Sequence, residues 1–398
     1  MNDSTNDISL PVAMPTSAIE LAELVASSHR DRAPLVVAGN STKLDWGGTV
    51  VGAKSVVSTQ KLDRLIAHAI GDLTVTVEAG MKFAQVQEIL ATAGQFLPLD
   101  PVYPDRATIG GIIATANTGS LRHRYGGVRD LLLGISFVRA DGKIAKAGGR
   151  VVKNVAGYDM MKLFTGSYGT LGILTEVTWR VYPQPTNTGT VIITGAIDSL
   201  ATAAKILLAS TLTPIAVDVV STALSQHLEL SNTPSLVVKF ATIPASIAEQ
   251  SAQLLDIAKG LGLKAGIWKG TQAENLWSGI QAGIWGNAPI GCKLGVRLTA
   301  AVDTIATLDR LTDRTASGVI HLNSGIGACA LATAAGISPL RSHCEANGGF
   351  LSMLQAPVAL KQHTDVWGYR GNAIPLMSQI KQQFDPLDIL NPGRCFSV

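Results

Sequence analysis

Three glycine-rich segments in the first half of the chain constrain its fold more than any other feature. They cover residues 38–43, 108–120 and 166–173, and each lies beside a run that predicts a β-strand. Glycine lets the backbone approach a ligand closely, and successive N–H groups in such loops can converge on an anion. A single loop of this kind is more often an ordinary turn. Three of them together favour a large ligand that carries phosphates and a flat ring.

The loops match neither of the common phosphate-binding sequences. No Walker A string G-x-x-x-x-G-K-[ST] occurs in the chain, and the first loop is not a Rossmann G-x-G-x-x-G. In that loop Ser41 and Thr42 follow Gly39 and add hydroxyl groups to the backbone donors. The small residues over 114–120 suit close packing against another backbone or against a planar group. FAD satisfies both requirements, because it combines a pyrophosphate with an isoalloxazine ring.

The composition indicates a globular chain of two or three domains. It has 398 residues, of which 46% are hydrophobic and 15% are charged. The net charge of +3 is too small to indicate a nucleic-acid partner. No apolar run approaches the ~20 residues that cross a bilayer, and the polar N-terminus lacks the pattern of a signal peptide. We therefore expect a cytoplasmic protein that does not span the membrane, with peripheral association at the inner face left open.

Strand and helix patterns alternate along the first half of the chain and stop at Pro183 and Pro185. Ser17 begins a capping-box sequence ahead of a predicted helix, and residues 73–78 alternate in the manner of a half-buried strand. The other predicted elements here are strands 35–37, 56–58, 131–139, 143–147 and 172–181 and a helix over 83–90. We place the first domain boundary at residue 185.

The second half predicts a different architecture, in which helices lie between strands. The predicted strands are 190–197, 215–220, 236–241, 293–298, 319–323 and 350–355, and the predicted helices are 200–208, 247–261, 302–314 and 340–346. This order indicates an α+β cap over residues 186–380, with an antiparallel sheet covered on one face. The tail, residues 381–398, contains Pro386, Pro392 and Gly393, which forbid a continuous helix.

Longer motifs around the loops resemble a known family of flavoproteins. The relevant runs are residues 39–43, 107–111, 124–130, 149–159, 166–173 and 385–394. They resemble the FAD-binding domain of the vanillyl-alcohol-oxidase and p-cresol-methylhydroxylase (PCMH) type, and within it the branch of glycolate oxidase and D-lactate dehydrogenase subunits. The resemblance implies an α+β fold: a PCMH-type two-subdomain FAD-binding domain over 1–185, a smaller α+β cap, and a tail that returns to the flavin.

The resemblance also implies a role for each matching position. Residues 39–43 would hold the pyrophosphate, the second loop would follow the pyrophosphate and the ring, and the third would line the adenosine or the ring edge. The implied FAD contacts are Gly39, Asn40, Ser41, Thr42, Lys43, Thr108, Ile109, Gly110, Gly111, Asn117, Gly119, Gly169, Gly172, Ile173 and Asn391. Some relatives attach FAD covalently through a histidine in the first loop. Asn40 and Ser41 stand there in this chain, so we expect non-covalent FAD, with attachment through His123 as the alternative.

Catalytic residues are less well marked than the flavin loops. Relatives carry a cap motif H-x-G-D-G-N-x-H, whereas residues 321–327 keep one histidine, His321, and lack the rest. His321 is a candidate proton acceptor and Arg124 a candidate carboxylate partner, although a structural histidine and a surface ion pair are the simpler alternatives. The four cysteines form no CxxC pair and the seven histidines form no HExxH, so we expect no metal site.

Three interpretations of function stay open. In the first, the chain is a flavin-bearing subunit of a complex that oxidises glycolate or D-lactate to the 2-oxo acid. Its partners would be a catalytic flavin subunit and an iron–sulfur subunit that passes electrons onward. In the second, it is an assembly subunit whose flavin is structural or absent. In the third, it is an independent FAD-dependent alcohol oxidase.

Overall fold

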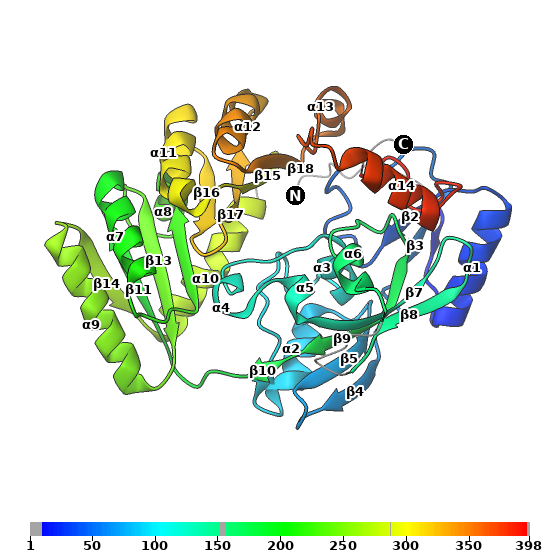
Figure 1. Cartoon of the computed structure of the whole chain (residues 1–398), viewed down its shortest axis with the longest axis horizontal. Coiled ribbons are helices and arrows are strands. Elements are labelled where there is room, and N and C mark those ends of the chain that lie inside the picture. Colours follow the sequence, from blue (N-terminus) through cyan, green and yellow to red (C-terminus); the bar gives the residue numbers. More distant parts are fainter. Residues whose placement is uncertain (1–9, 151–156, 287, 396–398) are drawn as a thin grey trace.

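The computed structural model describes residues 10–150, 157–286 and 288–395. The described part does not include residues 151–156, which belong to the sequence motif 149–159 of the family resemblance. It also does not include residues 1–9 of the polar N-terminus. The described chain forms two halves that lie side by side, one from the first half of the sequence and one from β11 to β18 (Figure 1). The mixture of helices and sheets agrees with the expected α+β class.

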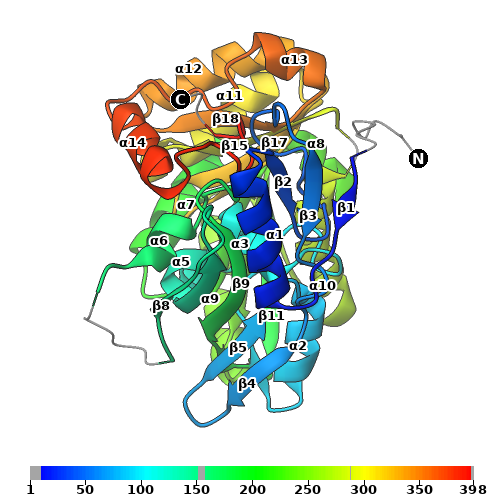
Figure 2. The same cartoon turned by 90° about the vertical axis from the view of Figure 1, so that its right-hand side faces the viewer.

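A small parallel sheet begins the first half. It consists of β1 (Val12–Ala13), β3 (Ser55–Ser58) and β2 (Leu35–Ala38), in that order. Helix α1 (Ala18–Arg30) lies beside it (Figure 2), and Leu21 and Val25 of the helix pack against Val57 of β3. Ser17 caps this helix as predicted, because its hydroxyl accepts a hydrogen bond of 3.1 Å from the Glu20 N–H.

A five-stranded antiparallel sheet completes the first half. Its strands are β4 (Leu65–Ala69), β5 (Thr74–Glu78), β9 (Ile173–Arg180), β7 (Leu132–Val138) and β8 (Ile144–Gly148), in that order. The expectation that β5 is half-buried was wrong, since all five of its residues are buried. Two of its polar residues have side-chain partners: Thr76 faces Thr178 at 2.9 Å between hydroxyl oxygens, and Glu78 binds Arg64, whose side chain is exposed.

Short helices cover this sheet and carry parts of the predicted loops. They are α2 (Phe83–Ala91), α3 (Ile109–Ala114), α4 (Arg122–Tyr125), α5 (Val128–Leu131) and α6 (Met160–Phe164). Apolar side chains of α2, α3, α5 and α6 join the core of the sheet. The two-residue strands β6 (Gln95–Phe96) and β10 (Tyr182–Pro183) pair with each other where the chain leaves this half.

The cap is built on an eight-stranded antiparallel sheet, which is the largest sheet of the described chain. Its strands, in spatial order, are β14 (Lys264–Trp268), β11 (Thr188–Thr194), β13 (Ser235–Ala241), β12 (Ala216–Val220), β16 (Ser317–His321), β17 (Ile326–Leu331), β15 (Ile290–Gly295) and β18 (Phe350–Gln355). The predicted elements of this half did not include β14 or β17.

Helices cover both faces of the cap sheet, so the expectation of one covered face was wrong. One face is covered by α7 (Ile197–Ala209), α9 (Pro244–Gly260), α11 (Ala301–Leu311) and α12 (Ile337–Ala346). The other face is covered by α8 (Thr222–His227), by α10 (Gly270–Trp285), and by Trp46 and Val102 of the first half. The unpredicted helix α10 therefore lies between the cap sheet and the first half, and the two halves share a core.

The chain returns to the first half at its C-terminal end. After the short helix α13 (Val358–His363), helix α14 (Ile374–Phe384) packs its Phe384 ring 6.1 Å from that of Phe164. Beyond α14 the chain is irregular, as its prolines predicted, and Leu390 forms a parallel bridge with Leu35 of β2. None of the described helices is long and apolar enough to cross a membrane.

Candidate functional site

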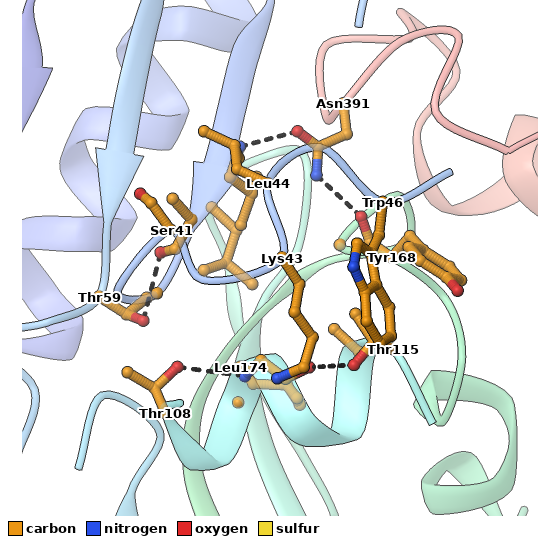
Figure 3. A pocket seen from close by; sticks show the side chains of 18 of the residues that line it. Ser41, Lys43, Leu44, Trp46, Thr59, Thr108, Thr115, Tyr168, Leu174 and Asn391 are labelled. Carbon is orange, nitrogen blue, oxygen red and sulfur yellow. Dashed lines mark hydrogen bonds between the residues drawn. The ribbon is translucent and has the colours of Figure 1, made fainter. Parts of the chain in front are cut away.

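The three glycine-rich loops meet around one pocket of the first half (Figure 3). It contains about 770 Å³ of empty space, including its open mouth. Most of the predicted FAD contacts line it: Gly39, Asn40, Ser41, Thr42, Lys43, Thr108, Gly110, Gly111, Gly169, Gly172, Ile173 and Asn391. The fold thus brings residues from both ends of the chain to a single surface.

Glycine is required here partly by contacts between the loops themselves. A Cβ on Gly39 would lie 2.1 Å from the Oγ1 atom of Thr108, which is the first residue of the second loop. Gly169 has a φ of +71°, and a Cβ there would lie 2.9 Å from Nδ2 of Asn391. The glycines therefore let three loops and the tail pack against one another, and the pocket forms between them.

Asn391 ties the tail to two of the loops. Its Oδ1 accepts a hydrogen bond of 2.8 Å from the Val37 N–H, and its Nδ2 donates one of 2.8 Å to the Tyr168 carbonyl (Figure 3). The residue has a φ of +47°, which asparagine tolerates better than most side chains. Asn391 thus lines the pocket, but its amide is occupied in holding β2 and the third loop together.

Lys43 places an amine in the pocket, over the ring of Trp46 at 5.8 Å from its centroid. Its side chain extends toward Thr108 and Thr115 (Figure 3), and the residue is 8% exposed. Among the described residues Nζ has no hydrogen-bond or ion-pair partner. Burial lowers the pKa of this amine to about 7. A buried ammonium without a counter-charge is costly, so the pocket suits a ligand that brings negative charge or acceptor oxygens to Nζ.

Three predicted contacts lie away from this pocket. Ile109 is buried in the core, and its N–H donates to the Met81 carbonyl. Asn117 accepts a hydrogen bond of 2.7 Å from the Val102 N–H and lines a second cavity. Gly119 lies against Asp100 and Gln281, each of which would be 2.7 Å from an added Cβ. These positions shape the boundary between the two halves.

The second cavity lies between the first half and the cap, and contains about 390 Å³ of empty space, including its opening to solvent. Trp46 and Thr115 line both cavities, so the two are neighbours. The remaining lining residues of the second cavity are Asn117, Thr118, Gln281, Trp285, Lys293, Val319, His321, Ile326, Gly327, Ala328 and Leu354. The rings of Trp46 and Trp285 form part of its wall, with centroids 4.4 Å apart.

His321, a candidate from the sequence, belongs to a buried polar group at this second cavity. Its Nδ1 lies 2.7 Å from Oδ1 of Asp218, whose other oxygen accepts a hydrogen bond from Ser120 of the first half. Burial lowers the pKa of His321, but the charge and hydrogen bond of Asp218, with the charge of Asp100, outweigh it and raise that pKa overall. Because Nδ1 is occupied, Nε2 is the nitrogen available to the cavity.

Two further candidates lie outside both cavities. Arg124 is exposed on α4. His123, the alternative attachment point for FAD, is partly buried, and burial lowers its pKa. Its backbone carbonyl accepts a hydrogen bond from Asn323 of the cap. Within the described ranges, no three His, Cys, Asp or Glu side chains gather as metal ligands would.

Three charged residues near the second cavity were not among the sequence candidates. Lys293 lines the cavity from β15, Asp218 holds His321 from β12, and partly buried Asp100 acts electrostatically on His321. Burial raises the pKa of Asp100 to about 6 and, helped by the charge of Arg122, lowers that of Lys293 to about 8. A signal was present, since Lys293 and Asp218 are each the one charged residue of an otherwise apolar strand.

Comparisons with known proteins agree with this geometry. The model of a family described as an FAD binding domain matches residues 10–148. Subunit GlcE of glycolate oxidase from Escherichia coli (strain K12) is 37% identical over 166 residues, which are 42% of this chain and 47% of GlcE. Subunit GlcD from Bacillus subtilis (strain 168) is 34% identical over 175 residues, 44% of this chain and 37% of GlcD. The matches thus span less than half the length of either subunit.

Two longer similarities cover almost the whole chain. The mitochondrial D-lactate dehydrogenase (cytochrome) of Arabidopsis thaliana is 26% identical over 419 residues, 96% of this chain and 72% of that protein. The structure of p-cresol methylhydroxylase with substrate bound superposes with a TM-score of 0.76 at 15% identity and covers 96% of this chain and 88% of that one. The second similarity shows that the fold is of the PCMH type, as the sequence predicted.

Proposed function

We propose that this chain, whose residues 10–148 form an FAD binding domain, is the FAD-binding subunit of a complex that oxidises glycolate or D-lactate to the 2-oxo acid. The observation that carries the proposal is the Lys43 ammonium, which has no hydrogen-bond partner among the described residues of the pocket where the three loops meet. FAD supplies what this pocket lacks, because its pyrophosphate and ring carbonyls offer charge and acceptors to Nζ. The names of GlcE, GlcD and the D-lactate dehydrogenase support the substrate class.

The residues of the pocket suggest how the cofactor is held. Residues 39–43 follow the C-terminal end of β2. They supply backbone N–H groups and the hydroxyls of Ser41 and Thr42 to the pocket. The small residues Gly110, Gly111 and Ala114 leave room for a flat group against α3. The described lining of this pocket contains no histidine, the residue type through which the resemblance implied covalent attachment, and the proposal keeps the FAD non-covalent. Bound FAD would supply the two-electron acceptor, and the chain would orient it and exclude water.

The partners follow from the same relatives. GlcE and GlcD are each named as a subunit of glycolate oxidase, which supports a multi-subunit assembly for this chain as well. The resemblance adds a catalytic flavin subunit and an iron–sulfur subunit that would receive the electrons. We place this assembly in the cytoplasm, with contact to the inner face of the membrane as an additional possibility.

One observation favours a second candidate, an independent FAD-dependent oxidase. The second cavity places Lys293 and the His321–Asp218 pair beside the flavin pocket, so the chain contains groups that suit a substrate of its own. An assembly role with a structural flavin has no such support. Loss of FAD from the complex without loss of activity would reveal that role.

Anaerobic reduction of the flavin separates these functions. Glycolate or D-lactate is added to the FAD-loaded chain alone and to the complex isolated with it, and the flavin absorbance is followed. The proposal expects bleaching in the complex. Turnover by the chain alone would establish the independent oxidase, and no bleaching in either would exclude both.

A variant of the flavin pocket tests whether this flavin takes part in the reaction. Gly39→Ala brings a Cβ against Thr108, whereas at Gly71, the control, an added Cβ meets no atom within 4 Å. We expect Gly39→Ala to lower both FAD content and complex activity, and Gly71→Ala to change neither. A Gly39→Ala complex that assembles without FAD yet keeps full activity would leave only the assembly role.

A further inference from the structure

We propose that Lys361 of the cap is a positioning residue for the flavin pocket. Its ammonium holds the backbone of residues 45–47 and thereby fixes Trp46 and Lys43 where they meet the ligand. Lys361 lines neither cavity and was not among the sequence candidates. The role rests on the proposed function for the identity of the ligand, FAD, but the contacts that carry it lie within the chain.

The ammonium of Lys361 binds three backbone carbonyl oxygens. Lys361 lies in α13, and its Nζ donates hydrogen bonds to the carbonyls of Asp45, Gly47 and Leu354, with Nζ–O distances of 3.0 Å for Gly47 and for Leu354. A charged lysine has three N–H donors, so each carbonyl can receive one of them. Two of the acceptors follow the first glycine-rich loop, and the third belongs to β18. The lysine therefore joins this loop to the cap sheet.

A second cation binds the carbonyls between and after those that Lys361 binds. Nη1 of Arg394, in the tail, donates hydrogen bonds of 3.0 Å to the carbonyls of Trp46 and Gly48. The four consecutive carbonyls of residues 45–48 are thus bound alternately by Lys361 and Arg394. This segment forms no helix or strand, so charge-assisted hydrogen bonds satisfy its backbone instead. Its peptide planes cannot rotate unless a bond to one of the two cations breaks.

The segment held in this way places two side chains of the flavin pocket. The Trp46 N–H donates a hydrogen bond of 3.1 Å to the Lys43 carbonyl, and Nζ of Lys43 lies 5.8 Å from the centroid of the Trp46 ring (Figure 3). A rotation of the Trp46 peptide would therefore move the indole and the amine together. Lys361 acts on the ligand through these two residues, since it does not itself line the pocket.

Substitution of Lys361 tests its positioning role, with Arg341 as the matched control. Arg341 is another partly buried cation of the cap, and it donates hydrogen bonds of 3.0 and 2.8 Å to the carbonyls of Leu351 and Asp365, outside the first loop. At a temperature where thermal melts show each variant to be folded, Lys361→Ala should weaken FAD binding roughly 10-fold or more in a fluorescence titration. Arg341→Ala should leave it unchanged. Unaltered FAD affinity in the folded Lys361 variant, or an equal loss in both variants, would overturn the proposal.

Chemical rescue tests the contact with the three carbonyls. Lys361→Ala removes the equivalent of n-propylammonium, so this ion, added to the variant, should restore FAD binding. Tetramethylammonium, which has the charge but no N–H donor, should not restore it. Equal effects of the two ions, or no rescue by n-propylammonium, would contradict the assigned hydrogen bonds. Lys361→Gln replaces the alanine variant in the titration if the latter does not fold.

Near-ultraviolet circular dichroism of the FAD-free chain follows Trp46 without relying on the ligand. The Trp46 ring lies 4.4 Å from that of Trp285, and neighbouring indoles give a strong signal that depends on their orientation. We expect the Lys361 variant to change this signal and Arg341→Ala to leave it. An unchanged signal would overturn the proposal. A changed signal in a protein whose natural form takes up no FAD would keep this inference and reject the proposed function.

Discussion

Nδ2 of Asn391 lies 2.8 Å from the carbonyl oxygen of Tyr168, although the two residues are 223 positions apart in the sequence. The same amide accepts the Val37 N–H through Oδ1. The tail therefore closes the flavin pocket by joining the strand before the first loop to the third loop. The arrangement of the loops around the pocket therefore depends on the last described segment of the chain.

Asn391→Gly tests this connection. Glycine keeps the positive φ but removes both hydrogen bonds and leaves the Val37 N–H without its partner. We expect a loss of about 1–3 kcal/mol in the free energy of unfolding and weaker FAD binding, measured by thermal melts and by flavin fluorescence titration. Glu229→Gly, at an exposed position with a φ of +57°, is the matched control. Equal effects of the two variants would mean that the amide contributes nothing specific.

Lys43→Met is expected to change stability and FAD affinity in opposite directions. Burial lowers the pKa of Lys43 in the folded protein to about 7, below its ordinary value. The folded state therefore carries the full cost of the charge below pH 7, and its stability rises with pH above that value, where the unfolded chain binds the extra proton. At pH 6 the FAD-free variant should be more stable than the natural protein by roughly 1 kcal/mol or more.

The same variant should bind FAD more weakly, because the ammonium that meets the ligand is gone. FAD titration followed by fluorescence measures this, and Lys54→Met at an exposed lysine is the control. A variant that loses stability at pH 6 and keeps its FAD affinity would show that Lys43 has a structural role.

Asp218→Asn should lower the pKa of His321. Asp218 raises that pKa through its charge and hydrogen bond, so the stability from this pair is complete below the ordinary histidine value and is lost as pH rises through the folded pKa. In the variant, this decline of the free energy of unfolding with rising pH should be absent. At pH 6 the variant should be about 1–3 kcal/mol less stable than the natural protein. NMR should show that His321 titrates at a lower pH in the variant. Asp303→Asn, beside His343 at the surface, should have little effect. An unmoved His321 titration would contradict the pairing.

Local patterns in the sequence predicted most of the strands and most of the longer helices of the fold, and tertiary packing decided the rest. Helix α10 begins at Gly270 and contains Gly279 and Gly283, which weaken helix propensity. It is stable because Leu276 and Ile280 are buried between the cap sheet and the first half. That burial depends on contacts across the interface, which no local pattern contains.

The flavin pocket was more predictable than the second cavity. Glycine loops are visible as strings, and the fold brings most of their predicted residues to one surface. The second cavity is assembled from single residues on separate elements: His321 at the end of β16 and Lys293 on β15 line it, and Asp218 on β12 binds His321. In the sequence, each of these residues is a single charged or titratable residue in a mostly apolar strand. Only the sheet order and the position of the first half show that they come together at one site.

The visible absorption spectrum of the purified chain, before and after acid precipitation, tests the central claim most directly. The account predicts a flavin spectrum that is present on purification or appears on addition of FAD, and a chromophore that moves to the supernatant when the protein is precipitated. A colourless protein that takes up no FAD would contradict the assignment of the pocket. A chromophore that stays with the precipitate would contradict non-covalent binding.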